Sequence, residues 1–177
     1  MKVYIIHGWE GYPEEGWFPW LKKELEKKGF KVEVPRMPNA DKPKLDKWLL
    51  TLDNLIKEDN SILIGHSLGC RVIMKYLEKN KAFGAVFVAA RMDKSFFKEL
   101  EEFYKKPVNW NNVKNNCKNI IGIYSDNDPY VPIKDSGILK EKLNAKIVIE
   151  HNKHHIGGDS GIKQLPSVLK AVMDFVR

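Results

Sequence analysis

Residues 62–69 read Ile-Leu-Ile-Gly-His-Ser-Leu-Gly. The apolar run before Gly65 predicts a buried strand, and the apolar spacing after Ser67 predicts a helix that begins at once. A serine between strand and helix matches the pattern Gly-x-Ser-x-Gly, in which a strained turn lifts the hydroxyl above the end of a sheet. Gly65 and Gly69 let the strand and the helix cross closely because they carry no side chains. Ser67 is therefore the candidate nucleophile.

Length and composition predict one globular domain over residues 1–177, of which 43% are hydrophobic and 30% charged. No apolar run approaches the roughly 18 residues that a membrane helix needs, and the polar-flanked first strand does not resemble a signal peptide. Two cysteines, Cys70 and Cys117, do not make a disulfide framework. We therefore expect a cytoplasmic protein without a membrane partner.

The formal net charge of +7 raises the question of nucleic-acid binding. The basic residues are mostly lysines that alternate with glutamates, as in Lys22-Lys23-Glu24, and there is no arginine cluster. Such a distribution is typical of a solvated surface, so we expect no nucleic-acid partner.

Apolar runs alternate with helical patterns along the whole chain. The expected strands are residues 2–6, 30–34, 61–64, 82–90, 120–124 and 146–149. This alternation predicts an α/β fold of three layers, α/β/α, with six parallel strands in the order 2-1-3-4-5-6. The order reverses between strands 1 and 3, so His7-Gly8-Trp9 and the serine turn should meet at the carboxyl edge of the sheet.

One connection is too long for a simple crossover. Residues 91–118 contain a helical piece around Lys94 to Tyr104 and an Asn-rich part around Pro107 to Asn116 that we expect to be irregular. Because it leaves the carboxyl end of the fourth strand, the segment is expected to form a small cap or lid near Ser67.

A serine hydroxyl needs a base, and the base needs an orienting carboxylate. The loop after the fifth strand, residues 125–132, offers two aspartates. We favour Asp128 as the acid because it lies three residues before Val131-Pro132, and prolines stiffen such a turn. Asp126 is the alternative, and its other role would be to cap the turn.

Five histidines are candidates for the base. We favour His155, on the loop after the sixth strand, with His154 as the alternative. His151 still belongs to the strand end. His66 neighbours the serine but is expected to point away from it, and His7 is expected to shape its own loop through hydrogen bonds.

An acyl-transfer intermediate needs two donors for its oxyanion. The N–H of Leu68, the residue after the nucleophile, is one candidate. The N–H of Trp9 is the other, because Gly8 allows the backbone of the loop after strand 1 to approach closely.

Several segments together resemble a known family. They are His7–Trp9 with Trp17–Leu21, Met37–Asn39 with Pro43, Leu45 and Trp48, Gly65–Gly69, Ser125–Pro132, and His155-Ile156 with Ser160-Gly161. The chain resembles the small serine hydrolases of the α/β-hydrolase fold that are related to the retinoblastoma-binding protein hydrolase and to bacterial YdeN-type proteins. The resemblance covers nearly the whole chain and supports His155, although His154 stands where the family often has a glycine.

The residues and the resemblance together predict a serine hydrolase of small acyl esters, with thioesters or amides as further substrates. Its catalytic residues would be Ser67, Asp128 and His155, without a metal or an organic cofactor. The alternative hypothesis is an α/β-hydrolase-fold module with weak catalysis that binds a protein partner, for which the sequence itself gives no motif.

Overall fold

The computed structural model describes residues 1–95 and 97–177. Its strands are β1 (Lys2–Ile6), β2 (Lys31–Glu33), β3 (Ser61–His66), β4 (Gly84–Val88), β5 (Asn119–Ser125) and β6 (Lys146–Glu150). They form one six-stranded sheet in the order β2-β1-β3-β4-β5-β6, and every neighbouring pair is parallel. The predicted fold class and strand order are therefore confirmed.

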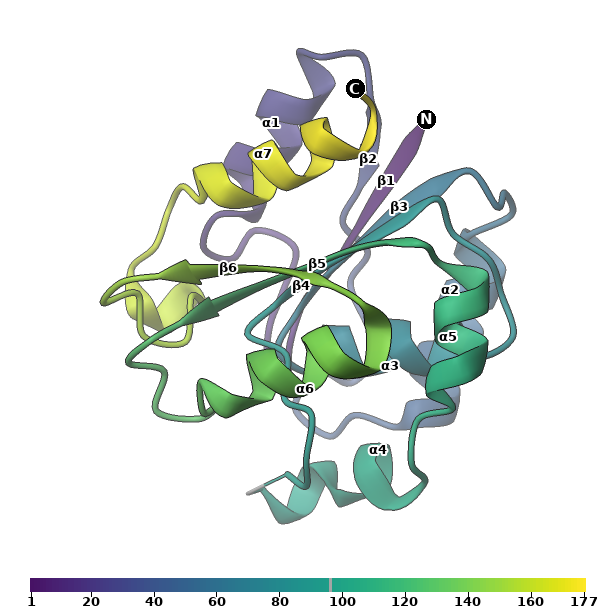
Figure 1. Ribbon diagram of the computed structural model, residues 1–177, viewed down its shortest axis with the longest axis vertical. Coiled ribbons are helices and arrows are strands. Elements are labelled where there is room, and N and C mark those ends of the chain that lie inside the picture. Colours follow the sequence, from purple (N-terminus) through teal and green to yellow (C-terminus); the bar gives the residue numbers. More distant parts are fainter. Residues whose placement is uncertain (96) are drawn as a thin grey trace.

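Helices cover both faces of this sheet. They are α1 (Phe18–Glu26), α2 (Leu45–Leu55), α3 (Leu68–Tyr76), α4 (Glu101–Lys105), α5 (Trp110–Asn116), α6 (Lys134–Leu143) and α7 (Pro166–Phe175). Figure 1 shows α1 and α7 together on one face, and α2, α3, α5 and α6 on the other. These are the three layers that the alternating pattern predicts.

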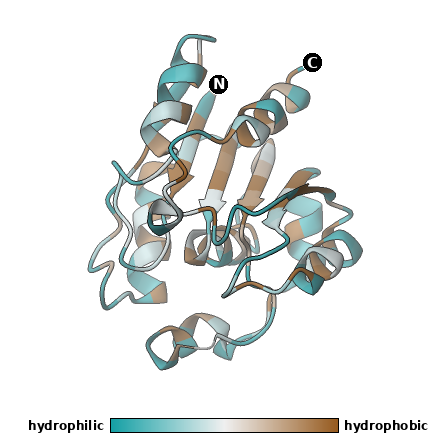
Figure 2. Ribbon diagram, turned by 90° about the vertical axis from the view of Figure 1, so that its left-hand side faces the viewer, coloured by the Kyte–Doolittle hydropathy of each residue, from teal (hydrophilic) through white to brown (hydrophobic). Residues whose placement is uncertain are grey.

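The period of two along the strands divides the core into two clusters. In β1, Val3 and Ile5 pack in the cluster under α1 and α7, whereas Tyr4 and Ile6 pack in the cluster under α2 and α3. All four side chains are fully buried. Figure 2 shows hydrophobic residues concentrated along the strands, which is expected of a parallel sheet covered on both faces.

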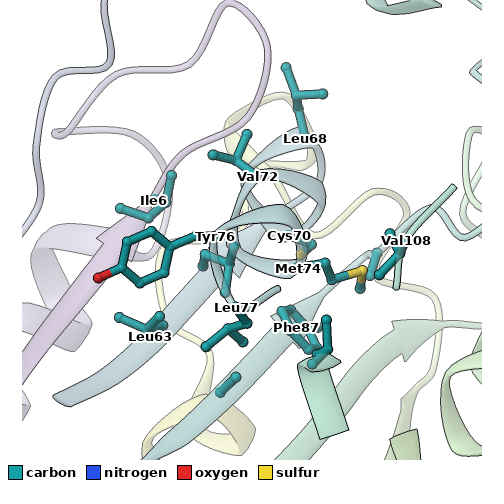
Figure 3. Close-up of a cluster of buried hydrophobic side chains, with 14 of the residues drawn as sticks. Ile6, Leu63, Leu68, Cys70, Val72, Met74, Tyr76, Leu77, Phe87 and Val108 are labelled. Atoms are coloured by element: carbon teal, nitrogen blue, oxygen red, sulfur yellow. The ribbon is translucent and has the colours of Figure 1, made fainter. Parts of the chain in front are cut away.

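Helix α3 is anchored most deeply, and it is the helix that follows Ser67. Its buried side chains, among them Val72, Met74 and Tyr76, face strand residues such as Leu63 and Phe87 (Figure 3). Full burial of one such apolar side chain stabilises the fold by about 1.5–3 kcal/mol. This packing holds the first turn of α3 against the carboxyl edge of the sheet.

The long connection after β4 differs from its prediction in two ways. The expected helical piece is shorter, namely a 3-10 turn (Lys98–Leu100) followed by α4, and residue 96 lies outside the described residues. The Asn-rich part, expected to be irregular, forms α5. There the Asn109 side chain accepts a hydrogen bond from the Asn112 N–H (3.1 Å) and caps the helix, while Val113 is buried.

Two expectations about organisation stay predictions: one domain over residues 1–177, and a small cap or lid formed by residues 91–118. In residues 1–95 and 97–177, no helix has the length and hydrophobicity required to cross a membrane.

Candidate active site

Ser67 lies at the apex of a sharp turn between β3 and α3. Its backbone has φ 52° and ψ −116°, which is a strained conformation for a residue with a side chain. Such a residue costs on the order of 1–3 kcal/mol and persists only where the surroundings hold it. Here the Ser67 N–H donates to the Val88 carbonyl (2.9 Å), and α3 begins at the next residue.

The two glycines of the motif are required by contacts with backbone atoms. A Cβ on Gly65 would lie 2.7 Å from the Cα and the N of Cys70. A Cβ on Gly69 would collide with the carbonyl oxygen of Ile6 and lie 2.7 Å from that of His7. Strand β1, strand β3 and helix α3 therefore meet so closely that neither position has room for a methyl group.

The structure brings Ser67, His155 and Asp128 into one hydrogen-bonded chain. His155 Nε2 lies 2.9 Å from Ser67 Oγ. His155 Nδ1 lies 2.9 Å from Asp128 Oδ2 and 3.1 Å from Asp128 Oδ1. These partners assign the Nδ1–H tautomer to His155, so Nε2 can accept the serine proton.

Asp128 is enclosed while the imidazole stays accessible. Its side chain is 1% exposed, against 19% for His155. Its Oδ1 also accepts hydrogen bonds from the N–H groups of Tyr130 (2.8 Å) and Val131 (3.0 Å). A buried carboxylate with several donors is fixed in position and satisfied, because burial without partners would be costly.

The loop that carries His155 is tied to the loop after β5 by consecutive hydrogen bonds. They run from Asn152 N–H to Asp126 Oδ1 (2.9 Å), from Lys153 N–H to Ser125 Oγ (3.0 Å), and from His154 N–H to Asn127 Oδ1 (2.8 Å). Asn152, His154 and Ile156 all have positive φ, which is uncommon for residues other than glycine. The bonds therefore hold a backbone path that the chain would not adopt by itself.

Three side chains hold the same loop from elsewhere in the fold. Trp17 Nε1–H donates to the Ile156 carbonyl (2.7 Å), His66 Nε2–H donates to the His155 carbonyl (2.9 Å), and Glu15 Oε1 accepts from the Gly158 N–H (3.0 Å). Burial lowers the pKa of His66 to about 3, so its ring is neutral at pH 7. A neutral ring with its proton on Nε2 is the form that can donate to this carbonyl.

The other candidate residues do not take part in the hydrogen bonds that join Ser67, His155 and Asp128. His154 is exposed, and only its backbone takes part in the bonds described above. Asp126 lies 2.6 Å from the exposed ring of His151, so it pairs with the base loop rather than only capping its own turn. His7 shapes its loop as expected, with Nδ1–H donating to the Gly8 carbonyl (2.8 Å) and Nε2 accepting from the Met37 N–H (3.0 Å).

The loop after β1 approaches the serine directly. A Cβ on Gly8 would lie 3.2 Å from the Cβ of Ser67, so the backbone passes beside the hydroxyl. Within the described residues, neither the Trp9 N–H nor the Leu68 N–H donates a hydrogen bond. Both residues line the same cavity as Ser67.

This cavity has a volume of about 790 Å³ and is open to solvent on one side. Its lining comes from the loop after β1, the serine turn, the connection after β4, the loop after β5 and the base loop. Among residues 1–95 and 97–177, no cluster of three or more His, Cys, Asp or Glu side chains is arranged to hold a metal ion. Cys70 and Cys117 are free and buried, and burial raises the pKa of both thiols.

Comparison with known proteins assigns the chain to a family. The sequence model described as serine hydrolase matches residues 3–174. The chain belongs to the serine hydrolase family. The resemblance drawn from the motifs is therefore confirmed.

Relatives of this serine hydrolase align over almost its full length. The Bacillus subtilis protein YdeN is 31% identical over 182 residues, covering 98% of this chain and 95% of YdeN. Serine hydrolase RBBP9 of Rattus norvegicus is 27% identical over 179 residues, covering 97% of this chain and 95% of that protein.

Solved structures show the same architecture. The crystal structure of the B. subtilis ydeN product is similar with a TM-score of 0.92 and 30% identity, covering 99% of this chain and 98% of that one. Est1E from Butyrivibrio proteoclasticus shares the fold at a TM-score of 0.76 and 18% identity, covering 99% and 86% of the two chains.

Sequence reasoning missed the residues that support the base loop. Trp17 is buried in the core, and its indole N–H also reaches the Ile156 carbonyl. That His66 points away from the serine stays a prediction; its ring lies beside that of His155, with the centroids 5.1 Å apart. Glu15 belongs to none of the motifs, and Asn127 lies in the segment Ser125–Pro132 but had no role assigned to its side chain.

Proposed function

We propose that this serine hydrolase is a carboxylesterase-like enzyme that cleaves small acyl esters through an acyl-enzyme intermediate. The observation that carries the proposal is the pair of hydrogen bonds that join Ser67, His155 and Asp128, with N···O distances of 2.9 Å on both sides of the imidazole. This is the arrangement in which a base can activate a serine while a carboxylate orients the base.

Ser67, His155 and Asp128 each have a distinct role in the proposed reaction. Ser67 Oγ attacks the acyl carbonyl carbon while its proton moves to His155 Nε2. The imidazolium, stabilised by Asp128, then gives the proton to the leaving alcohol as the ester C–O bond breaks. Water next attacks the acyl-enzyme, with His155 taking the water proton and returning one to Ser67. The products are a carboxylic acid, an alcohol and free enzyme.

The tetrahedral intermediate needs donors for its oxyanion, and we assign the N–H groups of Leu68 and Trp9. Two features support this: both N–H groups lack a partner in the described residues, and Gly8 lets the backbone approach Ser67. Removing one such donor typically costs about 3–4 kcal/mol of barrier.

The test is hydrolysis of short p-nitrophenyl esters by the wild type, by Ser67→Ala and by two matched pairs of variants. Ser67→Ala should abolish turnover. Asp128→Asn should lower kcat by about 10⁴-fold because the tautomer of His155 is lost, whereas Asp126→Asn should have little effect. His155→Ala should be as damaging as Ser67→Ala, and His154→Ala should not.

Hydrolysis that survives Ser67→Ala undiminished would overturn the mechanism. A folded wild type without any turnover would instead favour the alternative of a protein-binding module. The cytoplasmic location, the small-molecule acyl substrate and the expected lack of nucleic-acid and membrane partners stay predictions.

A further inference from the structure

A row of aromatic rings runs along the cavity beside Ser67. The ring centroids of Trp9 and Phe97 lie 5.0 Å apart, and those of Phe97 and Tyr130 lie 5.9 Å apart. The row ends at the base, where Tyr130 meets the His155 ring edge-on at 5.1 Å. It therefore spans from the proposed oxyanion donor to the proposed base.

Two of these rings are exposed although they are large and apolar. Phe97 is 37% exposed and Tyr130 is 44% exposed, and both line the cavity. Leu68, Leu100 and Val131 add apolar surface to the same lining. A concave site of this size is typical of a small-molecule site. These side chains form its apolar part, beside polar lining residues such as Glu15 and Asp159.

The three rings come from separate parts of the chain, and hydrogen bonds fix the Trp9 ring and the backbone of Tyr130 and Phe97. Trp9 Nε1–H donates to the Asp41 carbonyl (3.0 Å), so the indole is fixed at its polar end. The backbone N–H of Tyr130 donates to Asp128 Oδ1 (2.8 Å), which ties the backbone of Tyr130 to the proposed acid. The Phe97 N–H donates to Ser95 Oγ (3.0 Å). These bonds therefore fix the backbone positions from which the rings reach the cavity.

We propose that the site prefers esters that carry an aromatic ring close to the scissile bond. This inference rests on the proposed function and names its substrate class. Tilted and edge-to-face ring pairs attract each other beyond the apolar area that they bury, by an amount that corresponds to about two- to tenfold in binding. An aliphatic group of the same size would gain the burial but not the ring contacts.

The test uses substrate pairs that differ only in whether the ring is aromatic. On the alcohol side the pair is 2-phenylethyl acetate and 2-cyclohexylethyl acetate, and on the acyl side it is ethyl 3-phenylpropanoate and ethyl 3-cyclohexylpropanoate. The wild type should favour the aromatic member of at least one pair in kcat/KM by about two- to tenfold.

Variants show whether these rings cause the preference. Phe97→Leu and Tyr130→Leu should bring the ratio of kcat/KM values towards one, and Tyr130→Phe should restore it. The matched control is Tyr12→Leu, because Tyr12 is also exposed, at 47%, but does not line the cavity. This control should leave the ratio unchanged.

Equal kcat/KM values within both pairs, or a preference that Phe97→Leu and Tyr130→Leu leave intact, would overturn the inference while the proposed function stands. If the wild type hydrolyses none of the four esters, the proposed function is in question. Calorimetric binding of the same pairs to Ser67→Ala then tests the inference alone: tighter binding of the aromatic member supports it, and equal binding overturns it.

Discussion

The ring nitrogen Nε2 of His66 lies 2.9 Å from the carbonyl oxygen of His155. The residue before the nucleophile thus holds the backbone of the proposed base, while the side chain of that base reaches the nucleophile. The serine turn and the base loop are joined twice, by residues 66 and 67 on one side and by residue 155 on the other.

This contact predicts that His66→Phe lowers kcat by about tenfold with little change in KM, because the His155 carbonyl loses its donor and the imidazole loses its position. His66→Gln should restore most of the activity, since its amide can donate to the same oxygen. Steady-state kinetics of the three proteins provide the check. A loss in His66→Phe that His66→Gln does not rescue would mean that only the ring packing matters.

The depressed pKa of His66 predicts a loss of stability in acid. An unfolded histidine binds a proton below pH about 6.5, whereas buried His66 stays neutral down to a pKa of about 3. The unfolded state therefore takes up more protons as the pH falls through this range. From pH 7 to pH 4 this group should remove about 3 kcal/mol from the free energy of unfolding.

Urea unfolding at both pH values measures the effect. His66→Gln should lose less free energy of unfolding over this range than the wild type. If the two proteins lose the same amount, His66 does not have a depressed pKa.

Asn127 is predicted to be a positioning residue for the base loop. Its Oδ1 accepts hydrogen bonds from Ser125 Oγ–H (2.9 Å) and from His154 N–H (2.8 Å). Asn127→Ala should lower the free energy of unfolding by about 1–2 kcal/mol and kcat by about tenfold, without a matching rise in KM. Asn115→Ala, at an exposed position of α5, is the control. Equal kcat values for both variants would contradict this role.

Two glycine-to-alanine substitutions should change the stability of the protein in opposite directions. Gly69→Ala should prevent folding or severely lower the melting temperature, because the methyl group meets the backbone of Ile6 and His7. Gly137→Ala, inside α6 with no atom within 4 Å of the new Cβ, should stabilise the protein by about 0.5–1 kcal/mol. Thermal unfolding of the two variants distinguishes a glycine that is required because backbone atoms leave no room for a Cβ from one that has such room.

The sheet could be predicted from the sequence because each strand is marked by residues within its own short segment. Buried strands such as β3 are apolar runs bounded by turn residues, and the helices between them restrict the topology to parallel crossovers. Helix α5 was not predicted because its seven residues include four asparagines. A cap at Asn109 together with burial of Val113 outweighs their weak helix propensity.

The proposed catalytic residues were identifiable because they follow strand ends in a known order. The residues that hold the base loop in place were not identifiable, because their hydrogen bonds join positions that are distant in the sequence. Trp17 and Ile156 are 139 residues apart, and His66 and His155 are 89 apart. No local pattern marks a side chain whose partner is a backbone carbonyl on another loop.

The most direct test of the central claim is the intact mass of the protein after incubation with a fluorophosphonate, for the wild type, Ser67→Ala and His155→Ala. An activated serine predicts a single adduct on the wild type, none on Ser67→Ala, and much slower labelling of His155→Ala. Labelling of Ser67→Ala, or a folded wild type that stays unlabelled, would contradict the claim that Ser67 is the activated nucleophile.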